Sequence, residues 1–192
     1  MRASLAYLAG PVLVAGLLPL PALAEEGVRR ADFVTSIVPG LFCAPPEGGR
    51  RDAPGTMSGF VHVPDEPVVM FAEGRVAPAA LGMGFGVRFT VDAISPVLLD
   101  YRVTHPPMQP GNVTEQSWQG FVDPAVGESI FFQFDVPYEM QTGAWTIAAY
   151  LGETEVFSVD FTVVPAQQMP DALFQCRGEM LSLIPQDPVA AG

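Results

Sequence analysis

Side chains that could act as a catalytic base or a soft metal ligand are few in this sequence. Its 192 residues contain two histidines, His62 and His105, and no lysine, because all nine basic residues are arginines. Without an ε-amine there is no Schiff base, no lysine general base and no phosphate-binding lysine of a P-loop. Neither histidine lies at a spacing typical of a catalytic triad or a zinc site. The sequence therefore predicts no catalytic residue, no metal site and no cofactor.

One segment concentrates the remaining candidates, residues 104–112, which read THPPMQPGN. Its three prolines fix the backbone, so we expect a rigid connection between two strands. The alternative is an interaction loop that holds His105 and Met108 outward, with Arg102 and Trp118 on the flanking strands. Imidazole and thioether groups also suit Cu(I), so a small ligand or copper could bind at the 105–112 loop if further ligands converge there.

The two cysteines, Cys43 and Cys176, are far apart in the sequence and form no Cys-x-x-Cys redox motif. In an exported protein such a pair favours a structural disulfide over free thiols. This bond would tie the beginning of the domain to its C-terminal tail, and loop-closure entropy values such a bond at roughly 5 kcal/mol.

The N-terminal segment 1–24 has the features of a secretory signal peptide. Arg2 precedes a mostly apolar stretch that Pro11 interrupts, and residues 22–24 read ALA, a small-x-small cleavage site. A membrane anchor is the alternative, but the uninterrupted apolar run is short for a span of ~20 residues. We expect cleavage before Glu25 and a periplasmic or secreted location.

The charge balance narrows the class of partner. Twenty-one acidic residues against nine basic ones give a formal net charge of −12. Such a chain is repelled by polyanions, so nucleic acid is not an expected partner. No later segment contains ~18 uncharged apolar residues in a row, so no transmembrane segment is expected once the signal is removed.

The elements that must position these residues show a period of two. Apolar side chains alternate with polar ones along most of the chain from Gly84 to Val164, with turn residues between the runs. Gly152-Glu153 is typical of a tight two-residue hairpin. We expect an all-β fold, a single antiparallel β-sandwich of about eight or nine strands. The expected strands are 31–38, 59–63, 68–72, 84–91, 97–104, 117–122, 130–136, 145–151 and 157–163.

Three stretches are predicted to lie outside or beside these strands. Residues 39–55 contain paired prolines, glycines and arginines and are expected to form a loop. The sandwich domain is predicted to span 25–165. The tail, 166–192, is expected to hold one or two helical turns near 171–180, with Asp171 as a cap, and to be tied back by Cys176. Residues after Pro185 are expected to be disordered.

Several short motifs between Val76 and Val164 resemble a known bacterial family of exported proteins, domain of unknown function 3859. The motifs are Val76–Gly82 before the Phe85 strand, His105–Met108, Trp118, Phe134–Pro137 with Glu139, and Gly143–Thr146. The resemblance covers about half of the mature chain. It implies an immunoglobulin-like sandwich and carries no assigned activity.

Together these features predict an exported, non-enzymatic, immunoglobulin-like sandwich. Such folds present loops on a rigid frame, so we expect a binding or interaction module whose partner is a protein or a cell-envelope component. Binding of a small ligand or copper through the 105–112 loop is the alternative.

Overall fold

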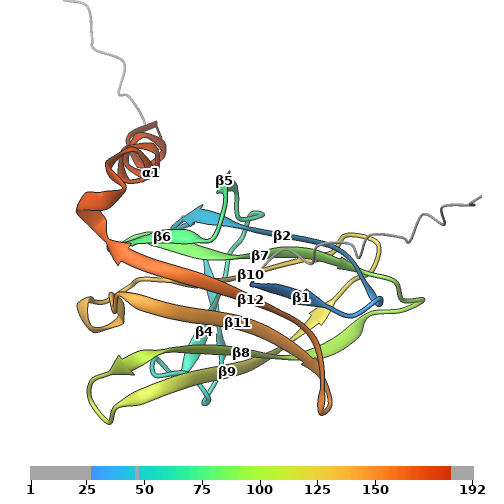
Figure 1. Ribbon diagram of the computed structural model, residues 1–192. Helices are drawn as coiled ribbons and strands as arrows, with labels where there is room; N and C mark the ends of the chain where they lie inside the picture. Colours follow the sequence, from blue (N-terminus) through green and yellow to red (C-terminus); the bar gives the residue numbers. More distant parts are fainter. Residues whose placement is uncertain (1–26, 46–47, 183–192) are drawn as a thin grey trace, which may run out of the picture.

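Two mainly antiparallel β-sheets packed face to face form the body of the molecule in the computed structural model, which describes residues 27–45 and 48–182 (Figure 1). The first sheet has the strand order β1-β12-β11-β8-β9, and β6 pairs with β12 in parallel. The second has the order β10-β7-β2-β5, and β3 and β4 form a separate hairpin. The predicted all-β sandwich is thus confirmed.

The first sheet consists of β1 (Val28–Arg30), β6 (Val76–Ala79), β8 (Val97–Met108), β9 (Val113–Val122), β11 (Gly143–Leu151) and β12 (Thr154–Pro165). The second consists of β2 (Val34–Cys43), β5 (Met70–Glu73), β7 (Met83–Val91) and β10 (Glu128–Gln133). The hairpin is β3 (Gly49–Asp52) and β4 (Phe60–Val63), and the short helices are η1 (Pro137–Glu139), η2 (Ala166–Gln168) and α1 (Pro170–Ser182).

The core lies between the two sheets, as the period of two predicts. Phe85 and Phe89 of β7 are fully buried, and their rings contact Trp145 of β11 at 5.3 Å and Phe157 of β12 at 4.7 Å between ring centroids. The prediction that Leu151 points inward is wrong. This residue is 47% exposed, because the β11–β12 register shifts between Ala149 and Tyr150. A bulge of this kind turns the following side chains to the other face.

Three short strands were not expected: β1, β3 and β6. The predicted loop 39–55 contains the second half of β2 and all of β3. β3 reads GRRD and is exposed along its whole length, so it has no apolar alternation by which to recognise it. It exists because it pairs with β4 from Gly49↔Val63 to Asp52↔Phe60.

The C-terminal tail contains the expected helix, and Asp171 lies in its first turn instead of at the cap. The predicted disulfide is present: Cys43, at the end of β2, is bonded to Cys176 of α1, with 5.2 Å between their Cα atoms. The signal segment 1–24 and the residues after Pro185 lie outside the described residues. Among the helices that the structure describes, none is long and apolar enough to cross a membrane.

Candidate functional site

The predicted 104–112 connection is mostly strand, because β8 continues through His105 to Met108. His105 is 6% exposed and Met108 is fully buried. The alternative of an interaction loop, in which these two side chains point outward, is therefore wrong for both residues. The reason is the strand period: His105 follows Leu99, Tyr101 and Val103 on the inward face.

Both ring nitrogens of His105 have partners. His105 Nδ1 lies 2.9 Å from the carbonyl of Pro106, and its Nε2 lies 3.2 Å from Gln116 Nε2. Gln116 Oε1 accepts the N–H of Met57 at 2.8 Å, so its amide nitrogen must face the imidazole. Nδ1 therefore carries the proton and donates to Pro106, and Nε2 accepts from Gln116. Burial lowers the pKa of His105, and the bond to the Pro106 carbonyl opposes that shift in part.

The four candidates of the interaction loop are not brought together. His105 Nε2 and Met108 Sδ both face Gln116 Nε2, the sulfur at 3.9 Å. Arg102 lies on the outer face of the sheet, 4.5 Å from the centre of the Tyr150 ring. Trp118 lies instead in the wall of a cleft. No group of three or more His, Cys, Asp or Glu that could hold a metal occurs in the described part of the chain.

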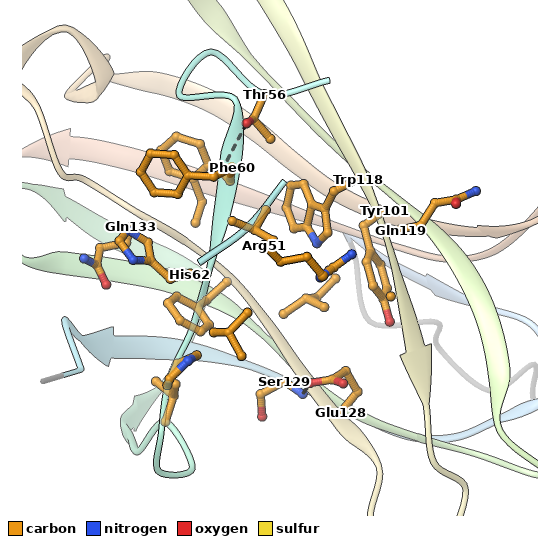
Figure 2. A pocket seen from close by; sticks show the side chains of 18 of the residues that line it. Arg51, Thr56, Phe60, His62, Tyr101, Trp118, Gln119, Glu128, Ser129 and Gln133 are labelled. Carbon is orange, nitrogen blue, oxygen red and sulfur yellow. Dashed lines mark hydrogen bonds between the residues drawn. The ribbon is translucent and has the colours of Figure 1, made fainter. Parts of the chain in front are cut away.

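The cleft has a volume of about 990 Å³. It lies between β9 and β10, which are edge strands of the two sheets, and the β3–β4 hairpin crosses it (Figure 2). One flank of the sandwich is therefore open, and residues from both sheets and the hairpin line it.

Three contacts place the hairpin across this opening. On one side, Ser117 of β9 donates its N–H to the Gly55 carbonyl at 3.0 Å. The bond from Met57 to Gln116 lies beside it. On the other side, His62 Nε2 lies 2.7 Å from Asp135 Oδ2, just after β10. The approach at β9 requires a glycine, because a Cβ at Gly55 would lie 2.5 Å from the Ser117 carbonyl oxygen.

Tyr101 reaches the cleft from β8, one strand in from the edge. Its ring lies over Gly120 of β9, where a Cβ would come within 2.8 Å of the ring, and its centroid is 5.9 Å from that of Trp118. Its hydroxyl is buried and has no hydrogen-bond partner among the described residues. Burial raises the pKa of Tyr101 well above its usual value, Glu128 adds to the rise and Arg51 opposes it. The hydroxyl therefore stays protonated.

The side chains of Glu128 and Arg51 lie near enough to the Tyr101 hydroxyl to affect its pKa (Figure 2). Glu128 begins β10, and its carboxylate accepts the N–H of Ser129 at 2.8 Å. Burial raises the pKa of Glu128, while the bond to Ser129 and the nearby Arg51 lower it in part. Arg51 comes from the exposed strand β3 and makes no ion pair within 4 Å in the described structure.

Two further carboxyl groups have structural partners. Glu139 is buried, and its Oε2 accepts the N–H groups of Asp135 and Val136 at 2.7 and 3.1 Å. Burial raises the pKa of Glu139, and these two bonds oppose the rise. Nearby, Gln133 donates its amide to Asp135 at 2.5 Å, and Gln133 Oε1 is buried without a partner among the described residues. Glu139, in the wall of the cleft, thus binds the backbone of Asp135 and Val136.

Sequence reasoning placed Trp118 correctly on the inward row of its strand but missed Arg51, Tyr101, Glu128 and Gln133 as site residues. The sequence predicts a loop for the stretch that contains Arg51, and the alternating pattern gives Tyr101 as an ordinary core residue. The signal that could have found the site is Gly120, a glycine on the inward row of β9, which makes room for the ring of Tyr101.

Comparisons with known proteins give a family and one similar fold. A family model described as "Domain of unknown function (DUF3859)" matches residues 30–163. No curated protein matches the sequence. Among solved structures, an immunoglobulin-like protein from Pseudomonas aeruginosa is similar, with a TM-score of 0.46 and 19% sequence identity. The similarity covers 74% of this chain and 99% of that one.

Proposed function

The chain belongs to the family of domain of unknown function DUF3859, and we propose that it is a non-catalytic binding module that takes a cell-envelope component in the cleft between β9 and β10. The matched family model carries no activity, so the proposal depends on the geometry of the cleft. A cleft of about 990 Å³ that combines aromatic walls with a few polar groups has the form of a ligand site.

The unpartnered Tyr101 hydroxyl is the observation that carries this proposal. A buried polar group without a partner is destabilising by about 1–3 kcal/mol, so such groups are rare in native structures. Two of the three such side-chain atoms in the described structure, Tyr101 Oη and Gln133 Oε1, belong to residues that line the cleft. The third, Ser158 Oγ, belongs to β12. A ligand that hydrogen-bonds to the first two would remove the penalty at both.

The histidines support binding in preference to catalysis. His105 is buried with both nitrogens occupied, and His62 is paired with Asp135. Neither contacts a serine, threonine or cysteine side chain among the hydrogen bonds of the described residues, as an activated nucleophile would require. The cleft is also favoured over the 105–112 segment as a copper or ligand site, because His105 and Met108 are buried against Gln116.

Export is part of the proposal. The disulfide between Cys43 and Cys176 is typical of proteins that fold in an oxidising compartment. The signal-like sequence at residues 1–24 supports the same location, periplasmic or secreted. In that compartment the available partners are envelope polymers and other exported proteins.

Tyr101→Phe tests the function, because it removes only the hydroxyl. Without a ligand this variant should unfold at the same or a higher temperature than the wild type, since a buried unpaired group is lost. Thermal unfolding is then measured with three bacterial envelope fractions: periplasmic proteins, a muramidase digest of peptidoglycan, and shed outer-membrane material. One fraction should raise the unfolding temperature of the wild type and raise that of Tyr101→Phe much less.

Glu153→Ala, in the exposed turn between β11 and β12, is the matched control and should respond as the wild type does. The proposal fails if no fraction stabilises the wild type. It also fails if Tyr101→Phe responds fully, because the hydroxyl would then have no part in binding.

A further inference from the structure

The lining of the cleft restricts the charge of its ligand. The lining residues include two arginines, Arg51 and Arg88. They also include five residues with carboxyl groups: Asp65, Glu66, Glu128, Asp135 and Glu139. The chain as a whole has a formal net charge of −12. A phosphorylated or otherwise anionic ligand would meet a repulsive field on approach. These charges favour a neutral or cationic ligand over an anionic one.

The polar groups that line the cleft distinguish between a neutral and a cationic ligand. A cationic group needs acceptors alone, but the lining of the cleft mixes both kinds of partner. Arg51 can only donate, Gln133 Oε1 and an ionised Glu128 can only accept, and the Tyr101 hydroxyl can do both. The guanidinium of Arg51 is near enough to Glu128 and Tyr101 to affect the pKa of each, so it would also repel a cation placed between them. A neutral ligand with neighbouring donors and acceptors fits this set.

An aromatic wall adds a flat apolar face. Trp118 of β9 is half-buried and stands beside Tyr101, and Phe60 of β4 lines the cleft from the hairpin (Figure 2). Tryptophan and tyrosine side chains combine an apolar ring face with a polar N–H or O–H group at the ring edge. The complementary ligand has hydroxyl or amide groups around its edge and C–H groups on its face, which is the chemistry of a sugar ring.

From these observations, and resting on the proposed binding function, we propose that the cleft binds a short neutral oligosaccharide, with Trp118 against a ring face and Arg51, Tyr101, Glu128 and Gln133 toward its hydroxyl or acetamido groups. A volume of about 990 Å³ is at the upper end for small-ligand sites, which suits an oligomer better than a single sugar. The polysaccharides of a bacterial envelope make such ligands available to an exported protein.

The two tryptophans of the chain provide a direct test. Trp118 lies in the cleft, and Trp145 is 1% exposed in the core, so only Trp118 should report on the ligand. The probes are chitotetraose, with acetamido groups, and maltotetraose, without them. At least one should change the tryptophan fluorescence of the wild type, and calorimetry should measure its affinity.

Trp118→Phe should abolish the fluorescence change and weaken binding by roughly tenfold or more, as removal of a central aromatic contact does. Tyr101→Phe keeps the reporter and the ring, so it gives an independent affinity, which should also fall. Glu153→Ala should bind as the wild type does. Unfolding temperatures of all variants show that each is folded.

The inference is overturned if neither oligosaccharide produces heat or a fluorescence change at millimolar concentration, or if Trp118→Phe binds as tightly as the wild type. Binding of a neutral or basic peptide in place of both sugars would overturn it as well. The proposed binding function would survive that last result, because it is tested separately with the envelope fractions.

Discussion

His105 shows how a polar residue is accommodated in the core of this molecule. It packs against Trp145, with 4.9 Å between ring centroids, and its two nitrogens bond to Pro106 and Gln116. Protonation would place an N–H against the amide of Gln116, and turning that amide would break its bond to Met57. The imidazole is therefore a structural group whose neutral form fits these contacts.

At the residue scale, we expect the double change His105→Ala and Met108→Ala to lower the free energy of unfolding by more than ~1.5 kcal/mol at pH 7.5, through lost packing and unmade hydrogen bonds. Burial holds the pKa of His105 below its usual value of 6.5. Its contribution to stability is thus present above that pH and lost as the pH falls through the lower value in the folded protein.

The difference between wild type and double variant should accordingly shrink between pH 7.5 and pH 5, as measured by urea unfolding. His62→Gln, made in both proteins, removes the other histidine and should leave the shrinkage in place. A loss below ~0.5 kcal/mol at pH 7.5 would contradict the burial of these side chains, because exposed positions tolerate such changes.

At the scale of elements, the β3–β4 hairpin is the piece that turns an open flank into a site. Its own residues are exposed or half-buried, so little of its stability comes from a core of its own. It is positioned by the bonds from Ser117 to Gly55 and from Met57 to Gln116, and by the pair of His62 with Asp135. Its placement therefore depends on these polar contacts together with its turn, where Met57 packs against the core and Ala53 is buried.

Gly55→Ala should release the β9 end of the hairpin, because its Cβ would lie 2.5 Å from the backbone oxygen of Ser117. We expect a loss of about 1–3 kcal/mol in unfolding free energy, as overpacking produces. Amide exchange at Ser117 should become faster. Gly49→Ala in the same hairpin is the control, since its Cβ would make only ordinary contacts at 3.7 and 3.9 Å. Equal effects of the two changes would contradict this account.

At the scale of the whole molecule, the first and last described elements are both tied to the sandwich. β6 and β1 both pair with β12 (Figure 1). The disulfide ties α1 back to β2. The cleft lies on the flank formed by β9 and β10, and the disulfide joins the other end of the chain to the sandwich. The frame is thus fixed independently of the site.

Cys43→Ser with Cys176→Ser should lower the unfolding free energy by about 2–5 kcal/mol, as loss of a native disulfide does in small exported domains. Labelling of the unfolded, unreduced wild type with a thiol reagent should find no free thiol. Two labelled thiols in protein recovered from the periplasm would contradict the bond.

The position of the mature N-terminus tests whether the protein is exported. We expect the mature chain to begin at Glu25, because residues 22–24 read ALA. Intact-mass analysis of protein secreted or recovered from a bacterial periplasm measures this directly. A mass that still includes Arg2 would show that the signal is not removed.

Local patterns were sufficient for much of the fold. Alternation of apolar residues between Gly84 and Val164 predicted six of the strands and the faces of Phe85 and Phe157, because one side of each strand must be buried. Gly152-Glu153 predicted its hairpin, since Gly152 adopts a φ of +61°. The pairing of Cys43 with Cys176 followed from the absence of any other cysteine.

Contacts between distant segments decided the rest. The prolines at 106 and 107 read as a loop, yet β8 continues through them, because the β8–β9 register is interrupted between Thr104 and Met108 and no ladder bond is required there. β3 has no apolar pattern and forms only by pairing. The cleft joins Arg51, Tyr101 and Glu128 from three separate strands, so only the tertiary structure, through the open flank between β9 and β10, could bring them together.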